Sequence, residues 1–415
     1  MSNYFLMNKD NIILEFSIED STYGENIKEV NSFSNLRPIG FTNINNWILD
    51  RNYAKHKKHF KKWLKEWGID TSKGFVEITH CLGINDCLWT KSVDSELSWN
   101  SVNMYKNQFT DVAQKTAFET GLHGLKLSST YFSSPEFTAE GSVPKFWKKE
   151  DDEIFLYKSQ LSGAANYGLE ANSEFISSFI LQQIFESQSV FYDITKVKNR
   201  LCSKCKLFTD EQFGYIPFYK CFDYFDIDND FYDNHFNTKD IIDISKDIGY
   251  EDDIRKMFFM DSLIFNQDRH LGNFGFLFNN DTFEIIDFAP SFDYNISMLC
   301  NALDSDICTY SSFKEYEYEY MLGHKLGGTF SNIGKEVITN TLNLMIPDVL
   351  YIPKSNVDSF NLSEKRIGYI ISILENNIKV ITGRDIKFKY DYADYLNINL
   401  DTVNYNSVKK SNNKY

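Results

Sequence analysis

The most constraining feature of this sequence is a polar loop enclosed by apolar elements. Residues 254–265 carry apolar side chains at helical spacing. The next eight residues read Asn266-Gln-Asp-Arg-His-Leu-Gly-Asn273, and two strand-like runs, 274–278 and 283–286, follow as an expected hairpin. A buried helix, a polar loop and a hairpin in this order predict a loop held rigidly by packed structure.

This loop carries two side chains suited to phosphoryl transfer. Asp268 supplies a carboxylate and Asn273 a carboxamide. In phosphoryl transfer an Asp accepts the proton of the substrate hydroxyl, while a nearby amide oxygen binds a magnesium ion on the nucleotide phosphates. The loop alone is suggestive, and its surroundings strengthen the interpretation.

Two aspartates beyond the hairpin compete as the second magnesium ligand. Asp287, in Asp-Phe-Ala, has the strand-end spacing of the Asp-Phe-Gly element in eukaryotic-type and phosphoinositide kinases. Asp293 ends the run Ala-Pro-Ser-Phe-Asp. The pattern of residues leaves both open.

Upstream residues supply the remaining parts of an ATP site. Lys158 ends an apolar strand over 153–158, as a phosphate-binding lysine does, and Glu174 lies on the helix expected from Asn172 or Ser173 to 185. Glu174 is the expected ion-pair partner of Lys158, and Glu170 is the alternative.

A turn before the lysine strand and a segment after the helix complete the expected nucleotide site. Gly141 and Ser142 lie in a turn that we expect to cover phosphates, although it lacks a Gly-x-Gly-x-x-Gly pattern. Cys221 and Phe222 end the strand-like group 214–222 and occupy the chain position of a hinge that hydrogen-bonds adenine. We also expect mostly helical structure from the hairpin to about residue 395.

The remaining charged residues of the loop have less specific roles. No Gly-x-Ser-x-Gly motif accompanies His270, so we expect it to hydrogen-bond within the loop and to fix Asp268 rather than to form a triad. Arg269 would anchor either a phosphate or an acidic neighbour.

Composition excludes several other classes of protein. The 415 residues are 42% hydrophobic with a formal net charge of −15, which favours two or three packed lobes and argues against direct nucleic-acid binding or an anionic membrane surface. No basic and apolar leader or long apolar run is present, and the seven cysteines are scattered. We therefore expect a cytoplasmic protein.

The motif resembles that of the HipA-like serine/threonine kinases. Their catalytic segment reads Asn-x-Asp-x-His-x-x-Asn and a later element reads Pro-x-Tyr/Phe-Asp, matched here by Asn266–Asn273 and Pro290–Asp293. The resemblance implies that Asp268 is the catalytic base, that Asn273 and Asp293 bind Mg²⁺, and that ATP is the donor. Asp293 is therefore preferred to Asp287. Leu82–Trp89 and Trp99–Tyr105 look like the CtkA-type branch of this family.

The resemblance also implies an architecture and partners. It implies an α+β, two-lobed protein-kinase-like fold: an accessory α+β region over 1–120, a small lobe over 121–225, a mainly helical catalytic lobe over 226–400 and a flexible tail over 401–415. The HipA toxins are autophosphorylated on a Ser before the lysine strand, and Thr138 and Ser142 are the candidates here. A protein substrate and a small antitoxin protein are the expected partners.

Two other functions compete with a protein kinase. Asp-Arg-His-x-x-Asn followed by Ile286-Asp-Phe288 also looks like the core of a phosphoinositide or other small-molecule kinase, although the acidic charge disfavours a membrane substrate. The second alternative is a catalytically silent nucleotide-binding pseudokinase or antitoxin-binding module. The presence of all the key polar groups disfavours this second alternative.

Overall fold

The computed structural model describes residues 2–22, 24–52, 65, 68–108, 145–160, 168–227, 236–304, 323–358 and 360–392. The chain divides into two compact units, each built from three stretches of sequence. The first contains Met1–Tyr157, Thr209–Ile216 and Phe276–Asp287. The second contains Lys158–Phe208, Pro217–Gly275 and Phe288–Tyr415.

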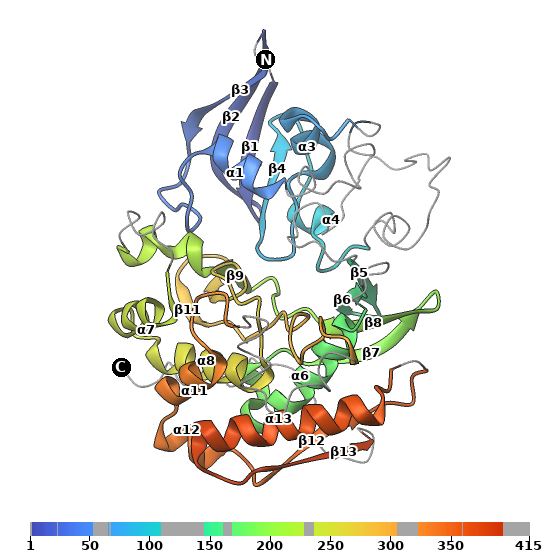
Figure 1. Ribbon diagram of the computed structural model, residues 1–415. Helices are drawn as coiled ribbons and strands as arrows, with labels where there is room; N and C mark the ends of the chain where they lie inside the picture. The colour runs from blue at the N-terminus through green and yellow to red at the C-terminus, as the bar shows by residue number, and fades with distance from the viewer. Residues whose placement is uncertain are drawn as a thin grey trace. The chain divides into compact units, whose positions relative to one another are not determined.

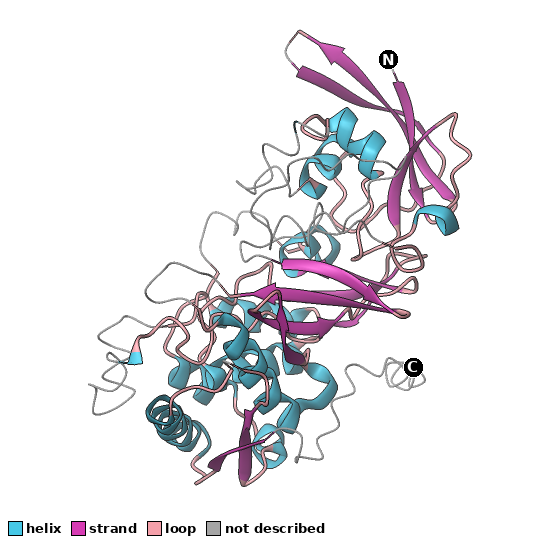
Figure 2. Cartoon of the chain, turned by 90° about the vertical axis from the view of Figure 1, so that its right-hand side faces the viewer, coloured by secondary structure: helices cyan, strands magenta, loops and turns pink. Residues whose placement is uncertain are grey.

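The first unit begins with a four-stranded sheet in the order β3-β2-β1-β4 (Figures 1 and 2). Its strands are β1 (Ser2–Asn8), β2 (Asn11–Ser21), β3 (Gly24–Ser32) and β4 (Leu88–Ser92). The pairs β1–β2, β2–β3 and β1–β4 are all antiparallel. Leu14 and Phe16 of β2 are fully buried, and this apolar alternation gives the sheet a covered face.

Short helices accompany this sheet. They are α1 (Ile44–Arg51), α3 (Ser72–Thr79) and α4 (Trp99–Val102). Asn43 caps α1 by accepting from Asn46 N, and Thr71 caps α3 by accepting from Gly74 N. These caps satisfy amide groups that a helix start otherwise leaves unpaired.

The first unit also holds most of a three-stranded sheet in the order β11-β10-β9. These strands are β9 (Phe213–Pro217), β10 (Gly275–Asn279) and β11 (Ile285–Phe288). Asn8 Nδ2 donates to Asn280 O at 2.6 Å, and Lys9 forms a 2.6 Å ion pair with Asp281. The N-terminal sheet is thus joined directly to the β10–β11 hairpin.

Strands β5 (Lys145–Glu150) and β6 (Glu153–Ser159) are neighbours, and β6 continues into the second unit at Lys158. That unit is centred on α6 (Glu170–Phe185), which buries nearly every side chain along its length. The short helix η3 (Glu186–Gln188) follows it, and β7 (Tyr192–Val197) and β8 (Arg200–Lys206) then form an antiparallel hairpin. A helix buried on all sides requires packed structure around its whole circumference.

Helices form most of the remaining second unit. They are η4 (Phe218–Cys221), η5 (Asp223–Phe225), α7 (Thr238–Asp247), α8 (Glu251–Ile264), α11 (Phe330–Val337), α12 (Asn340–Met345) and α13 (Glu364–Thr382). Strands β12 (Val349–Lys354) and β13 (Lys387–Tyr392) form a parallel pair. A Cβ on Gly334 of α11 would lie 2.5 Å from Ile381 Cδ1 of α13, so any larger residue there would require the Ile381 side chain to shift.

The predicted mixed α+β composition is confirmed, but several element predictions were wrong. The helix after Lys158 begins at Glu170 rather than at Asn172 or Ser173, and its N-cap, Leu169, makes no side-chain cap bond. Residues 218–221 form a 3₁₀ turn instead of extending the strand. The C-terminal region contains the β12–β13 pair as well as helices, and β13 alternates exposed Lys387 and Lys389 with buried Phe388, a two-residue period that marks a half-exposed strand.

The division into a small lobe over 121–225 and a helical lobe over 226–400 stays a prediction. Thr138, Gly141, Ser142 and the tail over 401–415 lie outside the described residues.

Candidate functional site

The predicted loop lies between α8 and β10 and is held by backbone hydrogen bonds. Phe265 ends α8 in the left-handed conformation, with φ +57°. Asn266 N then donates to Asp261 O at 3.0 Å, and Asn273 N donates to His270 O at 2.9 Å. His270 Nδ1 accepts from Gly272 N at 3.0 Å, so the predicted hydrogen bonding of His270 within the loop is present.

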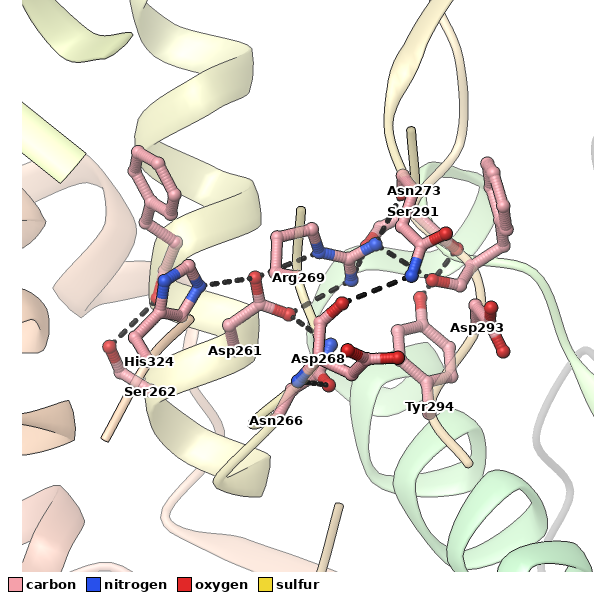
Figure 3. Close-up of polar contacts among 12 residues, drawn as sticks. Asp261, Ser262, Asn266, Asp268, Arg269, Asn273, Ser291, Asp293, Tyr294 and His324 are labelled. Atoms are coloured by element: carbon pink, nitrogen blue, oxygen red, sulfur yellow. Dashed lines mark hydrogen bonds and ion pairs between the residues drawn. The ribbon is translucent and has the colours of Figure 1, made fainter. Parts of the chain in front are cut away.

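Arg269 is the central anchor of the loop (Figure 3). Its side chain is fully buried and makes two 2.9 Å contacts with the Asp261 carboxylate. Nη1 donates to Asn273 O at 2.5 Å and to Phe292 O at 2.8 Å, and Nη2 donates to Ser291 Oγ at 2.9 Å. Of the two predicted roles of Arg269, the structure therefore shows the acidic neighbour, and one guanidinium joins the loop to the segment before Asp293.

The Asp261 carboxylate of α8 accepts hydrogen bonds from three side chains. Besides Arg269, Asn266 Nδ2 donates at 2.8 Å, and His324 Nε2 lies 3.2 Å away. Burial opposes ionisation of the Asp261 carboxyl, but the Arg269 charge and the hydrogen bonds outweigh it and lower the pKa to about 2. Because His324 Nδ1 accepts from Leu326 N at 3.2 Å, the ring proton belongs on Nε2, which donates to Asp261.

Asp268 and Asn273 are linked across the loop. Asn273 Nδ2 donates to Asp268 O at 3.0 Å, which fixes the amide nitrogen on that side. The Asn273 Oδ1 atom accepts no hydrogen bond from the described residues. Asp268 is more exposed, with 36% of its side chain accessible, and its Oδ1 atom lies 2.6 Å from Lys325 Nζ.

Lys158 lies between two carboxylates. Its Nζ atom is 2.6 Å from Glu174 Oε1 and 2.7 Å from Asp293 Oδ1. Burial alone would lower the lysine pKa, but the charges of Asp293 and Glu174 raise it well above its ordinary value, so the ammonium stays protonated. Lys158 also lies 5.3 Å from the ring centroid of Tyr192.

Glu174 and Asp293 are each oriented by a further residue. Ser203 Oγ of β8 donates to Glu174 Oε2, and burial raises the pKa of Glu174 against the opposing effect of Lys158. Asp293 N donates to Tyr192 Oη at 3.1 Å. Asp293 has φ +64°, a left-handed conformation that non-glycine residues rarely adopt and that is common at functional sites.

The second unit thus brings together Lys158, Glu174, Asp268, Asn273 and Asp293. Arg269 connects the loop to the residues beside Asp293, which contacts Lys158 directly. In Figure 3, Asn273 and Asp293 lie on the far side of Arg269 from Asp261 and His324, and Asp268 lies next to Arg269.

The other predicted site residues have their own surroundings. Asp287 belongs to β11 in the first unit, and Glu170 Oε2 accepts from Gly168 N at 3.1 Å. Cys221 and Phe222 are buried, and the Phe222 carbonyl already accepts from Phe225 N and Ile227 N. Their predicted contact with adenine stays a prediction.

Several residues that position the site were not predicted from the sequence. They are Tyr192, Ser203, Asp261, His324 and Lys325. One signal was available for Asp261, since an acid on the apolar face of a buried helix requires a cationic partner. The others come from distant segments and carry no local pattern.

No protein-family model matches the chain, and no curated protein matches it. Among solved structures, it is similar to the Helicobacter pylori proinflammatory kinase CtkA, with 17% identity, a TM-score of 0.44, and coverage of 59% of this chain and 90% of that one. It is also similar to a chain of the Shewanella oneidensis MR-1 toxin–antitoxin complex of HipA, HipB and operator DNA, with 11% identity, a TM-score of 0.47, and coverage of 92% and 96%.

Both printed names belong to the HipA-like and CtkA-type proteins that the sequence motif resembles. Within the described ranges, no helix combines the length and apolar character needed to span a membrane.

Proposed function

We propose that this chain is an ATP- and magnesium-dependent kinase that transfers the γ-phosphate to a protein serine or threonine hydroxyl. The observation that carries the proposal is the position of Lys158, 2.6 Å from Glu174 and 2.7 Å from Asp293, in the unit that also holds the Asp268–Asn273 loop. A protonated lysine, a carboxylate base and oxygen ligands for a cation are the parts that phosphoryl transfer requires.

The side chains fit a magnesium ion. Mg²⁺ prefers carboxylate and amide oxygens, and Asn273 Oδ1 and the Asp293 carboxylate are oxygens of these two kinds. Because Asn273 Nδ2 is bonded to Asp268 O, its oxygen is directed away from that bond. Asn273 and Asp293 would therefore hold the ion, with Asp287 as the weaker alternative.

The protein's own residues then have separate roles. Glu174 and Asp293 keep Lys158 protonated for contact with nucleotide phosphates. Asp268 would orient the substrate hydroxyl and accept its proton, while Arg269 keeps the loop in register. Bound ATP would supply the phosphoryl group, and the magnesium ion would neutralise charge on the phosphate oxygens. Catalysis in such a site comes from positioning and electrostatic stabilisation.

The finer assignments rest on the sequence: the first two on the order of its elements, the last two on the family resemblance. They are phosphate contacts from the Gly141–Ser142 turn, adenine contacts near Cys221 and Phe222, autophosphorylation on Thr138 or Ser142, and a small antitoxin as partner. None of these assignments is needed for the proposed chemistry of Lys158, Asp268, Asn273 and Asp293.

Incubation of the purified full chain with γ-labelled ATP and Mg²⁺ tests the proposal. We expect label on serine or threonine of the chain itself or of an added peptide pool, and we expect Asp268→Asn to abolish it. Label on phosphoinositide vesicles alone would favour the lipid-kinase alternative. Nucleotide binding without any transfer would favour the silent binding module.

A further inference from the structure

A five-residue turn, His324–Gly328, packs against both α8 and α7. His324 N donates to Gly328 O at 3.2 Å, and Gly327 N donates back to His324 O at 2.8 Å. Gly327 and Gly328 both have φ +88°, which glycine adopts without strain. Leu326 O accepts from Thr238 N at the start of α7 at 3.0 Å.

The same turn contacts Asp261, the carboxylate that binds Arg269 of the loop over 266–273. The His324 ring contacts the Asp261 carboxylate and packs edge-on against Phe258, with ring centroids 5.3 Å apart. Asp261 binds Arg269 on its other side (Figure 3). One buried carboxylate therefore fixes the position of the turn relative to the loop.

Lys325 is the residue that this turn presents to the loop. Its Nζ atom lies 2.6 Å from Asp268 Oδ1, and half of its side chain is exposed. Among the described residues, Asp268 is the ammonium's only hydrogen-bond or ion-pair partner. The turn is built from buried contacts, whereas the lysine side chain itself is free to change rotamer.

An ammonium in this position lies close to the group being transferred. The attacking hydroxyl oxygen must lie about 3 Å from the base and about 3 to 3.5 Å from phosphorus. A cation that touches one oxygen of Asp268 is therefore within a short movement of the phosphoryl oxygens. Charge on those oxygens is what cations at phosphoryl-transfer sites stabilise.

We propose that Lys325 is a further catalytic residue, whose ammonium moves from Asp268 to the oxygens of the transferring phosphoryl group. This inference rests on the proposed kinase function. In the step, the bond between phosphorus and the β,γ-bridging oxygen breaks, ADP leaves with that electron pair, and the substrate oxygen bonds to phosphorus. The hydroxyl proton passes to the Asp268 carboxylate, and Lys325 stays protonated throughout.

Single-turnover transfer from MgATP to a serine- and threonine-containing peptide pool tests Lys325. For Lys325→Ala we expect a transfer rate about 100-fold lower, the loss typical of one electrostatic group, with MgADP affinity changed less than about twofold. Lys325→Arg should recover part of the rate, and added methylammonium should partly rescue Lys325→Ala. The melting temperature should stay near that of the unchanged protein, because an exposed ion pair contributes little.

Lys379→Ala is the matched control, since Lys379 of α13 is similarly exposed and forms a 2.7 Å ion pair with Asp385. It should leave the transfer rate unchanged. An unchanged rate in Lys325→Ala overturns the inference, and a faster rate would instead make Lys325 an inhibitory clamp on Asp268. If the unchanged protein transfers no phosphate at all, the kinase proposal fails and this inference fails with it.

Discussion

The ammonium of Lys158 lies 2.6 Å from the buried carboxylate of Glu174, and β6 and α6 supply the two groups. The pair is almost fully enclosed, with side-chain exposures of 10% and 1%. Removing one charge from such a pair leaves the other desolvated without a partner. A change at Lys158 should therefore lower both the stability of the fold and the proposed binding of phosphate.

Replacing Lys158 with methionine tests both effects. We expect phosphoryl transfer to fall at least about 100-fold, because the phosphates lose their cation. Stability should also fall by about 3 kcal/mol, unless Glu174 takes up a proton. Lys196→Met is the control, since Lys196 of β7 forms only a 3.6 Å contact with Asp358. Transfer at the normal rate in Lys158→Met would contradict the assignment.

Ser203 should stabilise the ionised form of Glu174. Its hydroxyl donates to Oε2, and hydrogen bonds to charged groups contribute about 1.5 to 3 kcal/mol. We expect Ser203→Ala to lower the free energy of unfolding by about that amount, measured by urea titration. Ser177 of α6 offers a comparison, because its buried hydroxyl has no hydrogen-bond partner among the described residues. Ser177→Ala should be close to neutral, and equal losses in both variants would argue against a specific role for Ser203.

Substitution of Asp293 or of Asp287 should distinguish which of the two aspartates binds magnesium. Asp293 contacts Lys158 directly, whereas Asp287 lies in β11 of the first unit. We expect Asp293→Asn to reduce transfer at least about 100-fold and to raise the Mg²⁺ concentration needed for half-maximal rate. Asp287→Asn should keep most of the activity. The reverse result would reassign the metal ligand to Asp287.

The Asp261 carboxyl predicts a specific pH dependence of stability. Its folded-state pKa of about 2 lies below its ordinary value of 3.8, so its contribution is present above about pH 4 and is lost as the pH falls toward 2. Between pH 5 and pH 3 this group should account for about 1 kcal/mol of lost stability. We expect the difference in unfolding free energy between the unchanged protein and Asp261→Asn to narrow by that amount. A difference that stays constant across this range would show that Asp261 is not ionised in the way its contacts indicate.

Local sequence patterns predicted the site residues and the elements that carry them better than the residues that position them. The strand over 153–158, the apolar helix before the loop and the hairpin after it appear as β6, α8, β10 and β11. Each follows from residues adjacent in sequence, and so does the short-range contact of His270 with Gly272. The predicted Lys158–Glu174 ion pair is also present.

The residues that position the site could not be predicted in the same way. Lys325, His324 and Ser203 reach the site from distant segments, and their contacts depend on how those segments pack rather than on local spacing. The start of α6 was missed because Leu169, at its N-cap, carries no capping side chain. Both errors arise where tertiary packing replaces local signals.

A structure of the chain with Mg²⁺ and a non-hydrolysable ATP analogue tests the central claim most directly. We predict the terminal phosphates against Lys158, with the magnesium ion held by Asn273 Oδ1 and the Asp293 carboxylate, and with Asp268 facing the γ-phosphate. A nucleotide bound away from these four side chains would contradict the account.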